Sequence, residues 1–433
     1  MTASLRVVLG LFGLSLLALA VNGSPIYSRL SYLWGFLLVG SWLWAALALR
    51  GVQIRREART LRAQVGQVFQ ERFDIQNDSR LLRPWLEVQD QSALPGSQGS
   101  HVFIMLRGRQ QRSYLVRTRL VQRGVFPLGP TVLASGDLFG LFPVSRTLPP
   151  DSSLLVYPIT VEVRAFPSPP GLLPGGEALR RRTHQVTPNA AGVREYAPGD
   201  SLNRIHWIST ARRERLMVKE FELDPLAEVW IFVDADREVQ AALPYSPPSL
   251  AADALWGPMT EPVLPPFTEE YAVSIAASLG RYFLQRGRAV GLVSCGQSQS
   301  PSVLSPDRGG RQLGKILEAL ALLRAEGDLP ISALAAAQAQ HLPRGSTVVL
   351  ITPSVQEEVA LTMDLLLRRG LRPVVVLLDA ASFGGSPGTK ALAAAITVLD
   401  VPVCQVANGA DVGTALSMAT PDLAIRREQG RNP

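Results

Sequence analysis

The chain has 433 residues, of which 47% are hydrophobic and 18% are charged, and its formal net charge is +7. This length allows two or three domains, each large enough to bury a core of its own. Two cysteines exclude a disulfide framework. A basic balance beside an apolar N-terminus is typical of a cytoplasmic membrane face, so we expect a membrane partner and no nucleic acid.

Two apolar runs at the N-terminus predict two transmembrane helices within residues 1–50. Residues 7–21 carry no charge, and residues 31–49 are long enough to cross a bilayer, which takes about 20 residues. Arginines then follow the second run: Arg50, Arg55, Arg56, Arg59 and Arg62. Because positive residues stay inside, the rest of the chain is expected in the cytoplasm, held at the inner (cytoplasmic) membrane. The alternative for the first run is a cleaved signal peptide, since Ala18-Leu19-Ala20 resembles a cleavage site.

Short extended stretches separated by Gly and Pro follow, and they predict an antiparallel β-sandwich over residues 51–167. Apolar and polar residues alternate in 112–124, which favours a half-buried strand. The apolar runs 101–108 and 153–158 are interpreted as buried strands. We find no catalytic constellation in this region and expect a structural or adhesive role.

Residues 223–420 alternate apolar strands with amphipathic helices, which predicts a doubly wound α/β domain around a parallel sheet. We expect strands at 228–235, 288–295, 346–352, 372–380 and 401–407, with helices at 268–287, 311–326 and 356–370. Ligands of such folds bind at the carboxyl ends of the strands. A flexible tail is expected over 421–433.

The linker 168–222 ends in an arginine-rich stretch, 194–222. Pro198-Gly199-Asp200 predicts a turn in which Asp200 caps a short helix over 201–212. Three roles are open for this stretch: a clamp between domains, a surface for a partner protein, or an active site with His206 as general base. We rank the clamp first and catalysis last, because a base needs an orienting acid that the sequence does not identify.

Three segments resemble the domain-of-unknown-function 58 family. The signature itself consists of Arg194, Tyr196, Gly199, Asp200, Arg204, His206, Trp207, Arg212 and Lys219. Residues 119–142 and 269–294 look like further segments of that family. Ile208 departs from the pattern, where a Lys is expected after the Trp. The resemblance implies a von Willebrand factor A-like C-terminal half, pairing with a MoxR-type AAA+ ATPase, and no established enzymatic activity.

A von Willebrand factor A-like domain, by the same resemblance, would hold a divalent ion through Asp-x-Ser-x-Ser after its first strand. Here that position reads Asp234-Ala235-Asp236-Arg237-Glu238, and Thr352 is followed by Pro353. The site is therefore expected to be degenerate. Asp234, Asp236, Glu238 and Thr352 remain candidate ligands for Mg²⁺ or Ca²⁺, which prefer oxygen donors.

The resulting hypothesis is a membrane-anchored, non-enzymatic adaptor or assembly factor that works with a MoxR-type AAA+ ATPase. No small-molecule substrate is evident. The alternatives are a divalent-metal-dependent protein-binding module and an enzyme centred on His206. The proline-rich segment 241–267 is interpreted either as a lid or partner-binding arm, or as a disordered insertion.

Overall fold

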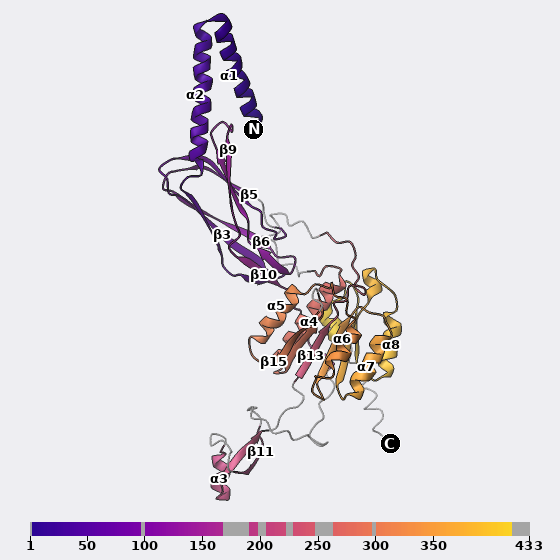
Figure 1. Cartoon of the computed structure of the whole chain (residues 1–433). Coiled ribbons are helices and arrows are strands. Elements are labelled where there is room, and N and C mark those ends of the chain that lie inside the picture. The colour runs from indigo at the N-terminus through magenta and orange to yellow at the C-terminus, as the bar shows by residue number, and fades with distance from the viewer. Residues whose placement is uncertain are drawn as a thin grey trace. The chain divides into compact units, whose positions relative to one another are not determined.

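A computed structural model describes residues 2–96, 100–167, 190–197, 205–221, 228–246, 263–296 and 300–417 (Figure 1). The chain forms two compact units. Unit 1 comprises 1–159, 245–263 and 317–322, and unit 2 comprises 160–244, 264–316 and 323–433. The protein is thus multi-domain, with two N-terminal apolar helices and several sheets. The predicted tail 421–433 lies outside the described residues, as do residues 168–189, 198–204 and 222 of the predicted linker.

Helices α1 (Ala3–Asn22) and α2 (Pro25–Ala48) form a hairpin (Figure 1). Gly23, at φ +61°, ends α1, and its amide donates to the carbonyl of Leu19 over 2.9 Å. Both helices are long and apolar enough to cross a membrane. Only 11% of the most apolar stretch of α1 and 17% of that of α2 are buried, so their apolar side chains face mostly outward. The hairpin is therefore compatible with membrane anchoring.

The rest of unit 1 holds three small sheets. The first has the order β1-β3-β6, the second β5-β4-β8-β9 and the third β2-β10-β7. Pairing is antiparallel throughout except between β2 and β10. The strands are β1 (Val52–Ala58), β2 (Arg62–Gln64), β3 (Val68–Asn77), β4 (Arg83–Asp90), β5 (Ser100–Leu106), β6 (Gln111–Arg119), β7 (Gly124–Pro127), β8 (Thr131–Gly136), β9 (Pro143–Leu148) and β10 (Ser153–Tyr157).

One core joins the first two of these sheets. Phe73 and Ile75 of β3 pack with Leu86 of β4, Phe103 of β5 and Leu133 of β8. Sheets that bury one face show period-two burial, and β3 alternates in this way along its length. Several sheets are therefore present as expected, while their description as one antiparallel sandwich stays a prediction.

The prediction of a buried strand at 101–108 is wrong for most of its side chains. Strand β5 lies at the edge of its sheet, and Val102 and Ile104 are 52% and 66% exposed. Apolar composition predicts a strand, but burial of both its faces needs a layer packed over each face. Val102 and Ile104 alternate with Phe103, which packs in the shared core, so they face away from that core.

Unit 2 contains a six-stranded sheet of order β15-β14-β13-β16-β17-β18. Neighbours are parallel except β14 and β15, which are antiparallel. The strands are β13 (Glu228–Val233), β14 (Ala289–Ser294), β15 (Ser302–Asp307), β16 (Thr347–Thr352), β17 (Arg372–Leu378) and β18 (Val403–Val406). The intervening helices are α4 (Thr268–Gln285), α5 (Gln312–Leu322), α6 (Ile331–Gln338), α7 (Glu358–Arg368), the 3₁₀ turn η3 (Ala380–Phe383), α8 (Thr389–Val398) and α9 (Val412–Ser417).

Helices cover both faces of this sheet. Helices α6, α7 and α8 share one core with Trp230 and Phe232 of β13 and with alternate residues of β16 and β17. Helix α4 contacts the same strands without joining that core, so it covers the opposite face. Burial on both faces explains why these strands are continuous apolar runs.

A separate two-stranded hairpin carries the arginine-rich stretch. Strands β11 (Ala190–Glu195) and β12 (Met217–Phe221) pair antiparallel, and helix α3 (Trp207–Arg213) precedes β12 (Figure 1). Ile205 forms an isolated bridge with Val218 instead of continuing the helix. The described helix therefore begins at Trp207, later than the predicted start at 201.

Candidate functional site

The order of the six-stranded sheet reverses at β13. From β13 the chain moves to β14 on one side and later returns to β16 on the other side. In open α/β sheets, ligands bind beyond the carboxyl ends of the strands at such a reversal. Asp234 directly follows β13, and Thr352 ends β16, so the topology brings both residues to this point.

Asp234 is the most constrained group there. Its carboxylate accepts the Thr352 hydroxyl over 2.6 Å and the backbone N–H of Asp236 over 3.1 Å. The residue is 3% exposed. Burial raises the pKa of Asp234 to about 7, while the bonds from Thr352 and Asp236 oppose that rise. A carboxyl in this state exchanges a proton near neutral pH.

The other acidic side chains of the predicted loop make contacts of their own. Asp236 is buried, and its carboxylate accepts the backbone N–H of Glu238 over 3.0 Å. Glu238 is exposed. Arg237 forms an ion pair of 2.9 Å with Asp328, in which both side chains are well exposed. The loop thus satisfies much of its own hydrogen bonding.

Three polar residues that the sequence did not single out complete this edge of the sheet. Gln240 donates to the backbone carbonyl of Asp234 over 3.2 Å, and the Thr268 hydroxyl donates to Gln240 over 2.7 Å. Ser354 donates its backbone N–H to the Thr352 hydroxyl over 2.9 Å. Thr268 opens α4 and is fully buried. The sequence signal for Thr268 is its place at the start of the predicted helix 268–287, while its burial is visible only in the structure.

The candidate ligands fit a divalent ion only in part. Asp234 and Thr352 meet, but each carboxylate oxygen of Asp234 already accepts a hydrogen bond. Among the described residues, no group of three acidic, His or Cys side chains is disposed to hold a metal. Mg²⁺ and Ca²⁺ need about six or more oxygen ligands. Asp234 and the Thr352 hydroxyl would be the anchoring donors, and Asp236 would have to reorient to join them.

The signature residues are only partly described. Gly199, Asp200 and Arg204 lie outside the described residues, as do the side chains of Arg194 and Lys219. Their backbones pair in β11 and β12, with Arg194 opposite Val218 and Lys219 opposite Val193. Tyr196 continues this ladder through its N–H, which donates to the carbonyl of Leu216 over 2.8 Å.

The described side chains of the signature lie on the surface of their hairpin. Trp207 is 68% exposed, and Arg212 is also exposed. His206 Nδ1 lies 2.7 Å from Ser209 Oγ, a neighbour on the same turn and not an orienting carboxylate. The backbone N–H of His206 donates to the carbonyl of Met217 over 2.7 Å, which ties the start of α3 to β12.

Backbone contacts join the two ends of the proline-rich segment 241–267 to each other. Ala242 bridges Phe267, and the N–H of Leu243 donates to the carbonyl of Pro266 over 3.1 Å. Residues 247–262 lie outside the described part of the chain, so neither interpretation of this segment is decided.

Comparison with known proteins supports the family resemblance over a short region. The family model described as "Protein of unknown function DUF58" matches residues 192–241. These residues include β11, α3, β12, β13 and the Asp234 loop. "Uncharacterized protein YeaD" of Bacillus subtilis (strain 168) is 27% identical over 216 residues. That match covers 49% of this chain and 46% of the relative, so the chain spans about half the length of the curated relative it matches.

Solved structures show only remote similarity. Proximal thread matrix protein 1 from the mussel byssus gives a TM-score of 0.30 at 11% identity and covers 46% of this chain and 48% of that chain. The CARDB domain of the PF1109 protein from Pyrococcus furiosus gives 0.18 at 8% identity and covers 24% of this chain and 91% of that chain. Similarity this low does not identify a shared fold.

Proposed function

We propose that the protein is a membrane-anchored, non-enzymatic adaptor or assembly factor whose chain after α2 lies in the cytoplasm. The observation that carries this proposal is the outward-facing apolar hairpin α1–α2, which belongs to the same compact unit as strands β1 to β10. The basic residues after α2 support a cytoplasmic orientation. By family resemblance, the partner is a MoxR-type AAA+ ATPase and the α/β unit is von Willebrand factor A-like.

The exposed signature supports a partner surface on the β11–α3–β12 hairpin. Trp207 and Ile208 are 68% and 65% exposed, and large aromatic side chains with neighbouring arginines are typical of binding hot spots. Arg212 and Arg213 close the last turn of α3. The interdomain clamp, ranked first from the sequence, remains the alternative role for these residues.

Co-purification from detergent extracts tests the partner. We expect the full-length protein to retain a MoxR-type ATPase and Trp207→Ala to reduce the recovered ATPase at least ten-fold, since hot-spot residues contribute about 2 kcal/mol or more. Leu361→Ala is the matched control, because Leu361 is 70% exposed on α7, outside the signature. Repeated pull-downs without such an ATPase would argue against the adaptor proposal.

A second candidate function is a divalent-metal-dependent protein-binding module. It is favoured by the hydrogen bond between Asp234 and Thr352 at the sheet reversal. Titration calorimetry of the full-length protein with Mg²⁺, Ca²⁺ and Mn²⁺ tests it. Binding should strengthen as the pH rises through about 7, because the ion must displace the proton of Asp234. Absence of binding heat at millimolar ion would remove this candidate.

A further inference from the structure

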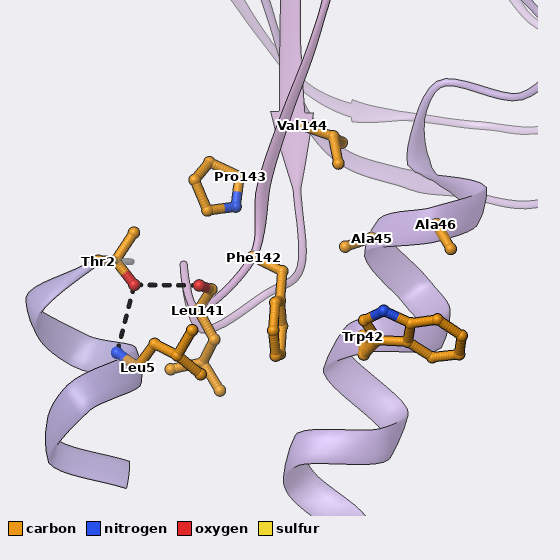
Figure 2. Close-up of a pocket in the computed structure, with 9 residues that line it drawn as sticks. All are labelled: Thr2, Leu5, Trp42, Ala45, Ala46, Leu141, Phe142, Pro143 and Val144. Carbon is orange, nitrogen blue, oxygen red and sulfur yellow. Dashed lines mark hydrogen bonds between the residues drawn. The ribbon is translucent and has the colours of Figure 1, made fainter. Parts of the chain in front are cut away.

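A hollow of about 610 Å³ lies where the helical hairpin meets the β8–β9 connection (Figure 2). Its walls come from the first turn of α1, the last turns of α2 and the segment 141–144. A second hollow of about 290 Å³ shares Leu5, Trp42 and Phe142 with the first and extends to Leu9 and Leu38. Because the two hollows share these three lining residues, they adjoin each other, and we name them together the hairpin groove.

The walls of this groove are held in place by hydrogen bonds. The Thr2 hydroxyl donates to the carbonyl of Leu141 over 3.0 Å and accepts the N–H of Leu5 over 3.2 Å (Figure 2). The carboxylate of Asp137, which is 1% exposed, accepts the N–H groups of Phe139 and Phe142 over 2.9 and 2.7 Å. The β8–β9 connection is therefore preformed and tied to the start of α1.

Polarity changes along the groove. The larger hollow lies at the helix ends and includes the Thr2 hydroxyl, whereas the smaller is lined only by apolar side chains. Leu9 is four residues beyond Leu5 on α1, which places the smaller hollow about 6 Å deeper along the helix. The larger hollow, with the Thr2 hydroxyl, is the mouth of the groove, and the smaller hollow is its apolar inner part. This arrangement fits a molecule with a polar head and a hydrocarbon chain.

The surroundings of the mouth match a membrane surface. Leu138 and Phe139 at the tip of the connection are 65% and 61% exposed, and Trp42 is 59% exposed. Exposed aromatic side chains beside apolar helices are typical of the bilayer interface. An aqueous setting for this apolar tip would be unfavourable, since each such side chain gains about 1.5–3 kcal/mol on leaving water.

Two exposed arginines lie near the mouth, whereas the nearby carboxylate of Asp137 is buried and bonded to backbone N–H groups. Arg146 lies two residues after Val144 on β9, so both face the same side of the strand, and Arg146 is exposed. Arg6 follows Leu5 on α1 and is also exposed. None of the residues that line the groove is charged. Cations at the mouth complement a phosphate group.

We propose that the hairpin groove binds one anionic glycerophospholipid of the surrounding leaflet. One acyl chain lies along Leu9, Leu38 and Phe142, and the phosphate lies on the side of Arg146. This inference rests on the membrane anchoring proposed above. A bound lipid would fix the sheets of unit 1 against the membrane surface, because it bridges the helices and the β8–β9 connection.

Native mass spectrometry of the full-length protein in detergent tests this proposal, with equimolar phosphatidylglycerol and phosphatidylcholine as probes. We expect one retained phosphatidylglycerol per chain. Ala46→Trp fills the larger hollow from an exposed position and should abolish retention. Leu43→Trp is the control, because Leu43 is 54% exposed on the same helix and does not line the groove. Arg146→Gln should lower the preference for phosphatidylglycerol about five-fold.

Each other outcome overturns the proposal. Equal retention of phosphatidylglycerol and phosphatidylcholine contradicts the assignment of an anionic headgroup. Retention of phosphatidylglycerol by Ala46→Trp contradicts the hairpin groove as the binding site. If the wild type is a dimer without bound lipid and Ala46→Trp is a monomer, the groove binds a second copy of the chain instead of a lipid. Membrane anchoring is checked separately by extraction. A chain released by carbonate without detergent contradicts the anchoring, whereas a chain that needs detergent but retains no lipid contradicts only the groove.

Discussion

At the scale of single residues, Asp234 combines burial with a position where the strand order of the sheet reverses. No ion pair to Asp234 is found in the described part of the chain, and its bonds come from a hydroxyl and a backbone N–H. Desolvation therefore dominates and raises its pKa to about 7. An ordinary aspartate titrates near 3.9, so folding shifts the carboxyl toward its protonated form.

This shift predicts a pH-dependent stability. The folded state binds more protons than the unfolded state between pH ~4 and ~7, so the contribution is fully present below pH ~4 and is lost as the pH rises through about 7. From pH 5 to 8 the wild type should lose about 2–3 kcal/mol that Asp234→Asn does not lose. The stability of the wild type relative to the variant should therefore fall between pH 5 and pH 8.

Thiol labelling in urea measures the difference in stability between the two proteins. It reports on unit 2, which contains both Asp234 and the two cysteines. The chain has two cysteines, and both are buried: Cys404 lies in β18, and Cys295 directly follows β14. Wild type and Asp234→Asn are compared at each pH, since thiol reactivity itself depends on pH. Identical labelling of the two proteins from pH 5 to 8 would contradict the raised pKa of Asp234.

At the scale of secondary-structure elements, a buried ionic triad joins three strands of unit 1. Arg56 of β1 bonds Glu71 of β3 over 2.6 and 2.9 Å and Asp90 of β4 over 3.1 Å. The three side chains are 8%, 2% and 7% exposed. The guanidinium also lies 5.0 Å from the ring centre of Phe73. The triad therefore links the two sheets that share the core.

Removal of the central cation should destabilise these strands. Arg56→Met leaves two buried carboxylates without a counter-charge, which costs about 3–5 kcal/mol. Hydrogen exchange of the full-length protein should show faster exchange in β1 and β3, with β13 unchanged as an internal reference. Arg55→Met is the control, because its pair with Glu57 is exposed and contributes under about 1 kcal/mol. Equal effects of the two substitutions would refute this role.

Elements were predictable where their pattern is strong. The apolar runs of β13, β14, β16 and β17 identify buried strands, because both faces of each strand are covered. Short elements without such patterns were missed, notably β15 at the sheet edge and the alanine-rich helices α6 and α8. Their formation depends on packing against neighbours that sequence periodicity does not reveal.

At the scale of the whole molecule, the hairpin topology predicts that the chain after α2 and the start of α1 share one side of the membrane. Asn22→Cys, at the last residue of α1 beside the turn to α2, should react with a membrane-impermeant maleimide added to intact cells. Arg59→Cys, after α2, should react only after permeabilisation. The two native cysteines are buried and give a low background. Reversed labelling would overturn the cytoplasmic orientation.

The apolar helical hairpin, the change from β-strands to an α/β pattern and the resemblance at residues 194–222 are predictable from the sequence, because each depends on local composition and spacing. The hydrogen bond between Asp234 and Thr352, which are 118 residues apart, becomes visible in the folded structure. The same holds for Thr2 and Leu141, which are 139 residues apart. Such contacts follow from strand order and from packing between elements, and no local pattern encodes either.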